Sequence, residues 1–427
     1  MNFKGDVVTA GVIIVIGACL FGLMLFFVDG GGQSYDIEME YEDWVEYQGD
    51  ALGIEGPIEI TNGMIHATGT GTAKIINVNG TTTTIRITPA HATLILMNGQ
   101  SNGAYYSYSR PPSASDIAKT PTLPYGTAFY FGWPDGMPVE SYDDPSACKF
   151  YDFMDVSTGQ VRVCDKGPEF CKTYAELTGK KVIWVCLAIP GKWIAAWDRP
   201  NGTCWVSNCN LMDYANAELD KLPFKIDRTI TLWAQGESDY RHSTGQAYYE
   251  GALKALIADA PKGWGRDIDA WYLLCGRTQK CGWVNDAFEN VAATTEGVFI
   301  GSTVALVDSF TYENGLLKSD SLHYTQTGDN ALANAAARSA AGAEDLAPIY
   351  LIQATATGDV GSTIAAPRTA RCYRTDSTSV LAGVTWDSSP SSSAAGTFVI
   401  YGTAANVGES AKLEFAPGPL LIVTVSE

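Results

Sequence analysis

The chain has 427 residues, with 28 Lys and Arg against 47 Asp and Glu, which gives a formal net charge of −19. This acidic balance excludes a nucleic acid as partner, because binding a polyphosphate backbone needs a basic surface. The 46% hydrophobic and 11% aromatic content excludes a wholly disordered chain. The length exceeds one ordinary domain of about 100–200 residues, so we expect two or three domains.

Residues 1–30 contain an uncharged run from Val7 to Val28, with Lys4 ahead of it. A helix needs about 20 apolar residues to cross a bilayer, and this run reaches that length. Three interpretations stay open: a membrane anchor with Lys4 inside, a helix resembling an archaeal pilin leader that packs in a filament core, and a segment removed in processing. All three place the rest of the chain outside the cytoplasm, at the cell surface or beyond it.

Residues 35–90 are rich in Thr, Ile, Val and Gly, with alternating runs such as IEITNGMIHATGT that are broken by Asn-Gly pairs. Alternation and Asn-Gly turns are typical of β-hairpins. We predict a β-rich stalk domain here.

From residue 91 to 345 apolar runs alternate with helical patterns, which indicates a parallel sheet covered by helices. The predicted strands are Thr93–Met97, Lys181–Ala188, Thr229–Ala234 and Ala270–Leu274. The predicted helices are Leu211–Leu222, Gly245–Ala258 and Asp329–Ala341.

From residue 349 to 427 Thr, Ser, Gly and Val dominate again, which predicts a second β domain. Its segment GVTWDSSPSSSAAGTFVIYGT resembles the bacterial Ig-like modules of cell-surface glycosidases. That resemblance implies an Ig-like β-sandwich.

The chain has 10 Cys, of which Cys19 lies in the apolar run. The short spacings of Cys204 with Cys209 and of Cys275 with Cys281 suit disulfides in an oxidising compartment. No pair has C-x-x-C spacing and the chain has only four His, so we expect no metal site.

Three polar segments stand where chemistry is expected. Ser101 follows the strand Thr93–Met97 within Asn98-Gly-Gln-Ser-Asn-Gly103, and Gln235-Gly-Glu-Ser-Asp239 follows the strand Thr229–Ala234. The carboxyl ends of parallel strands share one edge of a sheet, which is where open α/β sheets bind ligands. Asp320-Ser-Leu-His323 places a carboxylate three residues from an imidazole, so that Asp320 can fix the tautomer of His323.

In this order the three segments resemble the SGNH, or GDSL-type, hydrolase superfamily, and within it the sialate O-acetylesterase and acetylxylan esterase group. The run VIWVCLAIPGKWIAAW over residues 182–197 resembles the strand, glycine turn and Ile-x-x-Trp of that group. The resemblance covers residues 91–345 and implies a three-layer α/β/α, flavodoxin-like fold.

The resemblance also implies the roles of individual residues. Ser101 is the nucleophile, His323 the general base and then acid, and Asp320 the carboxylate that orients the imidazole. The backbone N–H groups of Ser101 and Gly191 and the side-chain amide of Gln235 form the oxyanion hole. The second segment also has two carboxylates, Glu237 and Asp239. We interpret them as groups that brace the loops around the site.

Aromatic residues near these segments suit stacking on sugar rings: Tyr105, Tyr106 and Trp133. They equally suit small local cores. The predicted function is that of a surface-tethered serine esterase that removes O-acetyl groups from carbohydrate of the sialate or xylan type and needs no cofactor. The alternative is a pilin-like filament or adhesin subunit whose hydrolase-fold domain binds glycans.

Overall fold

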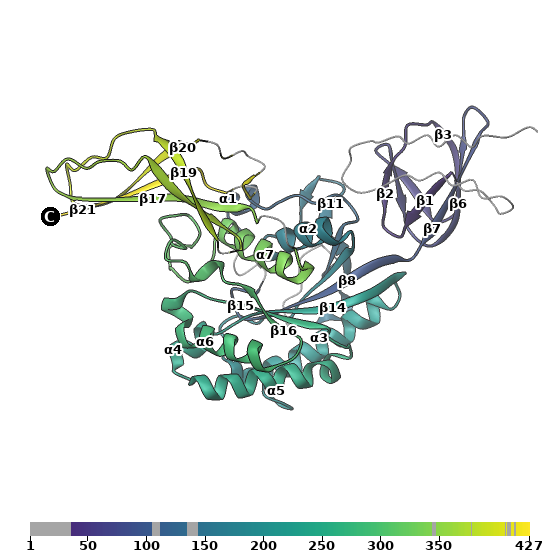
Figure 1. Ribbon diagram of the computed structural model, residues 1–427. Coiled ribbons are helices and arrows are strands. Elements are labelled where there is room, and N and C mark those ends of the chain that lie inside the picture. Colours follow the sequence, from purple (N-terminus) through teal and green to yellow (C-terminus); the bar gives the residue numbers. More distant parts are fainter. Residues whose placement is uncertain are drawn as a thin grey trace, which may run out of the picture.

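The computed structural model describes residues 36–104, 112–134, 144–343, 347–376, 378–405, 407, 411–413 and 416–427. A central α/β domain carries one β unit at each end, the N-terminal one in purple and the C-terminal one in yellow (Figure 1). The apolar segment predicted at residues 1–30 lies outside the described residues. Within the described ranges no helix is long and apolar enough to cross a bilayer.

The central sheet has the strand order β10-β9-β13-β8-β14-β15-β16. All neighbouring strands are parallel except the edge pair β9 and β10. The bounds are β8 (Ala90–Gly99), β9 (Ala128–Gly132), β10 (Lys149–Asp152), β13 (Lys181–Cys186), β14 (Phe224–Ala234), β15 (Ala270–Leu274) and β16 (Val298–Ser302). The chain runs from β8 to β9 and β13 on one side and then returns to β14 on the other. The adjacent strands β8 and β14 therefore form the topological switch point, where such sheets bind ligands.

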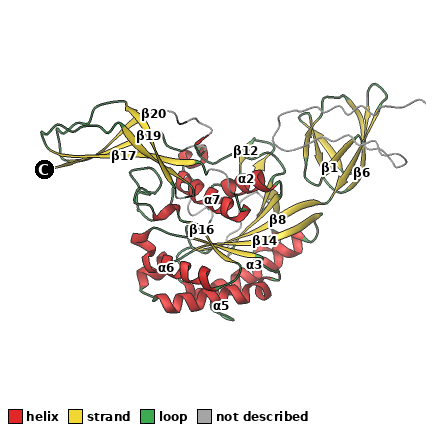
Figure 2. Cartoon of the chain, in the orientation of Figure 1, coloured by secondary structure: helices red, strands yellow, loops and turns green. Residues whose placement is uncertain are grey.

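Helices cover both faces of this sheet (Figure 2). One face carries α2 (Lys166–Thr178) and α7 (Gln326–Ala341), and the other carries α3 (Thr203–Leu219), α5 (Gln246–Trp264) and α6 (Thr278–Thr294). Side chains of β8 alternate between the layers, because successive residues of a strand point to opposite faces. Ile95 and Met97 pack with the alanines of α7, whereas Leu94 and Leu96 pack with α3, α5 and α6.

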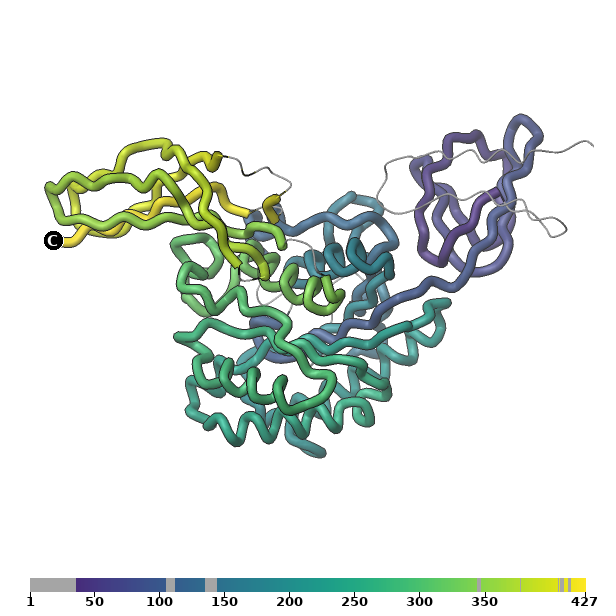
Figure 3. Tube along the Cα trace, in the orientation of Figure 1, coloured from purple at the N-terminus to yellow at the C-terminus, as the bar shows by residue number. Residues whose placement is uncertain are grey.

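The N-terminal β unit consists of two small sheets, with the orders β1-β7-β6-β3 and β2-β5-β4. Its strands are β1 (Ile37–Glu40), β2 (Trp44–Glu46), β3 (Ala51–Glu55), β4 (Ile58–Thr61), β5 (Met64–Ala67), β6 (Gly71–Asn77) and β7 (Thr82–Thr88). Isoleucines such as Ile65, Ile75 and Ile85 fill its core. The tube in Figure 3 passes from this unit straight into the central sheet, because Pro89 alone separates β7 from β8.

The C-terminal unit is a closed barrel of five strands in the order β17-β18-β19-β20-β21. The strands are β17 (Ile349–Asp359), β18 (Thr369–Arg374), β19 (Ser379–Trp386), β20 (Gly396–Ala404) and β21 (Leu420–Ser426). Its first and last strands pair in parallel and close the barrel. A β unit at this end agrees with the sequence, whereas the Ig-like identity stays a prediction.

The predicted disulfides are absent: none of the nine cysteines in the described part of the chain is joined to another by a disulfide. Cys204 and Cys209 both lie on α3, five residues apart, so their side chains point about 140° away from each other. Burial of Cys275 raises the pKa of its thiol to about 12. It is therefore a buried, uncharged group that packs as a small apolar side chain.

Candidate active site

A tight turn at the end of β8 presents Ser101 at the edge of the sheet. Gly99 has φ +126°, and a Cβ at this position would lie 2.0 Å from the carbonyl oxygen of Ala234. The next residue donates its backbone N–H to that same carbonyl at 2.9 Å. Only glycine lets β8 and β14 approach so closely at this point, and the turn that follows lifts Ser101 out of the sheet.

The histidine segment lies against this turn. The imidazole Nε2 of His323 lies 3.0 Å from Ser101 Oγ, and Nδ1 lies 2.6 Å from Asp320 Oδ2. The other carboxylate oxygen of Asp320 accepts the backbone N–H groups of Leu322 and His323, each at 2.9 Å. Hydroxyl, imidazole and carboxylate thus form one continuous hydrogen-bond chain, which is the arrangement needed to activate a serine.

The carboxylate of Asp320 is held in its charged form. Partial burial acts to raise its pKa, but hydrogen bonds from the ring and the backbone of His323 and from Leu322 outweigh this and lower the pKa below its usual value. Asp320 therefore stays ionised at neutral pH. An ionised acceptor at Nδ1 keeps the proton on that nitrogen and leaves Nε2 free to accept the serine proton.

Gln235 follows β14 and is buried, with 3% of its surface exposed. Its Oε1 accepts the hydroxyl of Tyr249 at 2.6 Å, which fixes the orientation of the amide. Its Nε2 faces three acceptors, which are Gln100 Oε1 at 3.2 Å, the Lys192 carbonyl at 3.1 Å and the Asp239 carboxylate.

The predicted role of the Gln235 amide in the oxyanion hole stays a prediction. In this structure its two N–H groups face three protein acceptors. The side chain ties the turn at Gln100 and Ser101 to the turn that contains Gly191. Gly191 itself has φ +73°, and no heavy atom lies within 4 Å of the position a Cβ would take, so the space beside its Cα is open.

The two carboxylates interpreted as bracing groups do contact neighbouring loops. Asp239 accepts the backbone N–H of Ile194 at 2.9 Å in addition to the Gln235 amide. Glu237 accepts the side-chain amide of Asn102 at 2.6 Å. Burial raises the pKa of Asp239, against the lowering effect of its hydrogen bonds from Gln235 and from Ile194.

Asn102, next to Ser101, joins all three segments. Its side-chain N–H₂ donates to Glu237 and also to the carbonyl of Leu322 at 3.2 Å. Leu322 directly precedes His323. Its backbone carbonyl accepts the ammonium of Lys166. Asn102 stands in the quoted motif, but sequence reasoning gave it no role because the partners of its side chain lie more than a hundred residues away.

Lys166 is a buried cation beneath the site. It pairs with Asp329 in the first turn of α7, and its ammonium lies 4.8 Å from the ring centroid of Tyr324. The Lys166 and Asp329 side chains are 5% and 9% exposed. The ion pair therefore links the nucleophile turn to the helix that follows the histidine, and no sequence signal distinguishes this lysine from a surface one.

The aromatic residues proposed to bind sugar have mixed outcomes. Tyr105 and Tyr106 lie outside the described residues. Trp133 is half-buried just after β9 and packs against the core layer of α3 and α5. Its position favours the local-core interpretation over an open stacking surface.

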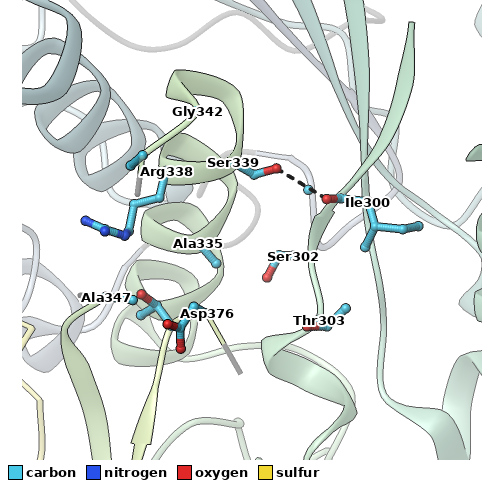
Figure 4. A pocket seen from close by; sticks show the side chains of 12 residues that line it. Ile300, Ser302, Thr303, Ala335, Arg338, Ser339, Gly342, Ala347 and Asp376 are labelled. Atoms are coloured by element: carbon cyan, nitrogen blue, oxygen red, sulfur yellow. Dashed lines mark hydrogen bonds between the residues drawn. The ribbon is translucent and has the colours of Figure 1, made fainter. Parts of the chain in front are cut away.

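A cavity of about 560 Å³ lies away from these segments, between β16, the end of α7 and the start of the C-terminal barrel. Figure 4 shows Ser339 of α7 hydrogen-bonded to the carbonyl of Ile300 at its wall, with Arg338 and Asp376 nearby. None of its lining residues belongs to the serine, histidine or glutamine segments.

Comparisons with known proteins agree with this geometry. Residues 137–341 match the family described as "Carbohydrate esterase, sialic acid-specific acetylesterase", a range that contains Gly191, Gln235 and His323. No curated protein matches the chain significantly.

Solved structures are similar at low identity. A protein from Arabidopsis thaliana is 16% identical, with a TM-score of 0.41, over 60% of this chain and 99% of its own. NanS is 10% identical, with a TM-score of 0.42, over 60% of this chain and 98% of its own. A carbohydrate acetylesterase from Xanthomonas citri is 12% identical, with a TM-score of 0.38, over 91% of this chain and 96% of its own.

The family match covers most of the α/β domain, and the serine turn that precedes it completes the same hydrogen-bond chain. The α/β domain is thus similar to the sialic acid-specific acetylesterase family over residues 137–341, and the protein is a carbohydrate O-acetylesterase.

Proposed function

We propose that the protein is a serine esterase of the cell surface that removes O-acetyl groups from carbohydrate through Ser101, His323 and Asp320. One observation carries the proposal: Ser101 Oγ, the imidazole of His323 and the carboxylate of Asp320 form an unbroken hydrogen-bond chain, at 3.0 and 2.6 Å, at the switch point of the sheet. A nucleophile, its base and an orienting group at these distances are the parts that acyl transfer needs.

The reaction proceeds in two steps. Ser101 Oγ attacks the acetyl carbonyl while His323 Nε2 takes its proton, and the C–O bond to the sugar breaks as that proton passes to the departing hydroxyl. Water, deprotonated by the same nitrogen, then attacks the acetyl-serine, and acetate leaves as that proton returns to Ser101 Oγ. Asp320 stabilises the imidazolium that forms in each step without taking its proton.

The oxyanion of each tetrahedral intermediate needs preset donors, each worth about 3 kcal/mol. We assign this role to the backbone N–H groups of Ser101 and Gly191. Gln235 holds the turns of these two residues together through its bond to the Lys192 carbonyl. The reaction requires no metal or organic cofactor, because the chain supplies nucleophile, base and donors.

Acetate release from O-acetylated xylo-oligosaccharides and O-acetylated sialic acid tests the activity. We expect Ser101→Ala to lose at least about 10³-fold in kcat, because removing a triad member leaves only oxyanion stabilisation and binding. Ser146 is an exposed serine that takes no part in this hydrogen-bond chain, so Ser146→Ala serves as the matched control. Equal acetate release by the Ser101→Ala and wild-type proteins would overturn the proposal.

The location at the surface rests on the uncharged run Val7–Val28, which is long enough to span a bilayer. The two β units, the second of them Ig-like in sequence, would then hold the esterase domain away from the membrane and near polysaccharide. Fractionation of cells that express the full chain or a deletion of residues 1–30 tests this: loss of membrane association is expected only in the deletion. Identical fractionation of both proteins would contradict the anchor.

A further inference from the structure

One tryptophan at the rim of the site is exposed although its neighbours are buried. Trp193 exposes 49% of its surface and stands directly before the short helix η2 (Ile194–Trp197). By contrast, Ile194 and Trp197 in that helix are 1% and 2% exposed. A large apolar side chain left open beside a catalytic turn is a candidate for binding rather than for packing.

The backbone of Trp193 is fixed from both sides by the groups that assemble the site. The residue before it, Lys192, accepts the amide of Gln235 with its carbonyl at 3.1 Å. The residue after it, Ile194, donates its N–H to Asp239 at 2.9 Å. The same Gln235 amide bonds to Gln100 at 3.2 Å, which precedes the nucleophile. Trp193 is therefore tied to the nucleophile turn through a short chain of hydrogen bonds.

The indole of Trp193 also contacts a second ring on one side. The ring of His242, at the end of α4 (Glu237–His242), lies edge-on to Trp193 with the ring centroids 5.1 Å apart and the planes at 63°. Helix α4 begins directly after Gly236, so its position is set by the same second segment of the site. Two rings at a steep angle make a corner, and about half of the Trp193 surface (49%) is left open for a ligand.

We propose that Trp193, with His242 as its side wall, is the platform on which the sugar ring of the acetylated substrate stacks. This inference rests on the proposed function for its ligand class but not on turnover. The apolar C–H face of a pyranose matches the flat indole, and the fixed backbone at residues 192–194 holds that indole in register with Ser101. Trp193 is a substrate-binding residue in this account and takes no part in proton transfer.

The kinetic test compares two esters of acetate, an acetylated xylo-oligosaccharide and ethyl acetate, which has no ring to stack. For Trp193→Ala we expect the ratio of kcat/KM for the saccharide to that for ethyl acetate to fall roughly five- to tenfold, mainly through KM, as befits the loss of one aromatic contact. Trp193→Phe should keep at least half of the wild-type ratio. The matched control is Tyr401→Ala on the barrel, a ring that is 59% exposed and remote from the site. An unchanged ratio in Trp193→Ala would overturn the platform.

A binding test separates this inference from the proposed function. Calorimetry measures the affinity of the acetylated xylo-oligosaccharide and of O-acetylated sialic acid for the Ser101→Ala protein, with and without Trp193→Ala. We expect at least one saccharide to bind and to lose roughly five- to tenfold in affinity with Trp193→Ala. If the wild-type protein hydrolyses neither ester but this loss is seen, the proposed function fails and the platform stands. Equal affinity of the two variants, or no binding of either saccharide, overturns the platform.

Discussion

Replacing Lys166 with methionine removes the cation that is hydrogen-bonded to Asp329 in a buried ion pair. Lys166 and Asp329 are 5% and 9% exposed at their side chains, so water does not replace the lost interaction. Breaking such a pair on one side costs about 3–5 kcal/mol, whereas replacing both partners with uncharged groups of similar volume is often close to neutral. We therefore expect Lys166→Met to lower the free energy of unfolding by about 4 kcal/mol.

The double variant gives the sharper result. Lys166→Met with Asp329→Asn should be less destabilised than the sum of the single variants by at least about 1 kcal/mol, because residues in one buried network do not act additively. Urea unfolding followed by tryptophan fluorescence measures this in the α/β domain, since every Trp except Trp44 and Trp386 lies between residues 91 and 345.

An exposed ion pair supplies the matched control for this experiment. Lys221 pairs with Glu218 and is 64% exposed at its side chain, so Lys221→Met should change the free energy of unfolding by less than about 1 kcal/mol. The reasoning is refuted if Lys166→Met unfolds within about 1 kcal/mol of the wild-type protein, or if the effects of the two single variants at Lys166 and Asp329 simply add.

Three further outcomes are expected. Asp320→Asn should lower kcat by about 10²–10⁴-fold with little change in KM, because an amide in place of the carboxylate no longer holds the proton on Nδ1; steady-state kinetics showing a loss under tenfold would contradict this. Gly99→Ala should destabilise the protein by at least about 3 kcal/mol, since its Cβ would meet the Ala234 carbonyl at 2.0 Å at φ +126°; a thermal unfolding midpoint equal to that of the wild-type protein would argue against the turn. Burial raises the pKa of Asp165 to about 7, so the folded protein holds this proton more tightly than the unfolded chain, and stability falls as pH rises from about 4 to 7. Asp165→Asn should reduce the difference between the free energies of unfolding in urea at pH 5 and at pH 8. The same difference in the variant and the wild-type protein would contradict the raised pKa of Asp165.

Local sequence patterns were sufficient to predict individual strands and helices. The predicted strand Ala270–Leu274 is found with the same bounds, because strands of a parallel sheet are apolar on both faces and stand out from their flanks. The helix at the end of the domain begins at Gln326, three residues before the predicted start, because Thr325 caps it. The second β unit was predicted as a class, but its closure depends on pairing of β17 with β21 across some seventy residues, which no local pattern encodes.

The site was predictable where chemistry depends on residue type and order. Ser101, Asp320 and His323 stand in short motifs, and the structure brings them within hydrogen-bond distance. The role of Gln235 was not predictable, because it depends on Tyr249, which orients the amide from helix α5. Lys166 was missed for the same reason: its burial arises only when the nucleophile turn and α7 close over it.

The most direct test of the account is to trap the acyl-enzyme. Full-length protein turning over an O-acetylated saccharide is quenched in acid, digested and mapped by mass spectrometry. We predict that one acetyl group is found, on the peptide that contains Ser101. An acetyl group on any other residue, or acetate release at the wild-type rate by Ser101→Ala with no acetylated peptide, would contradict the claim that this serine is the nucleophile.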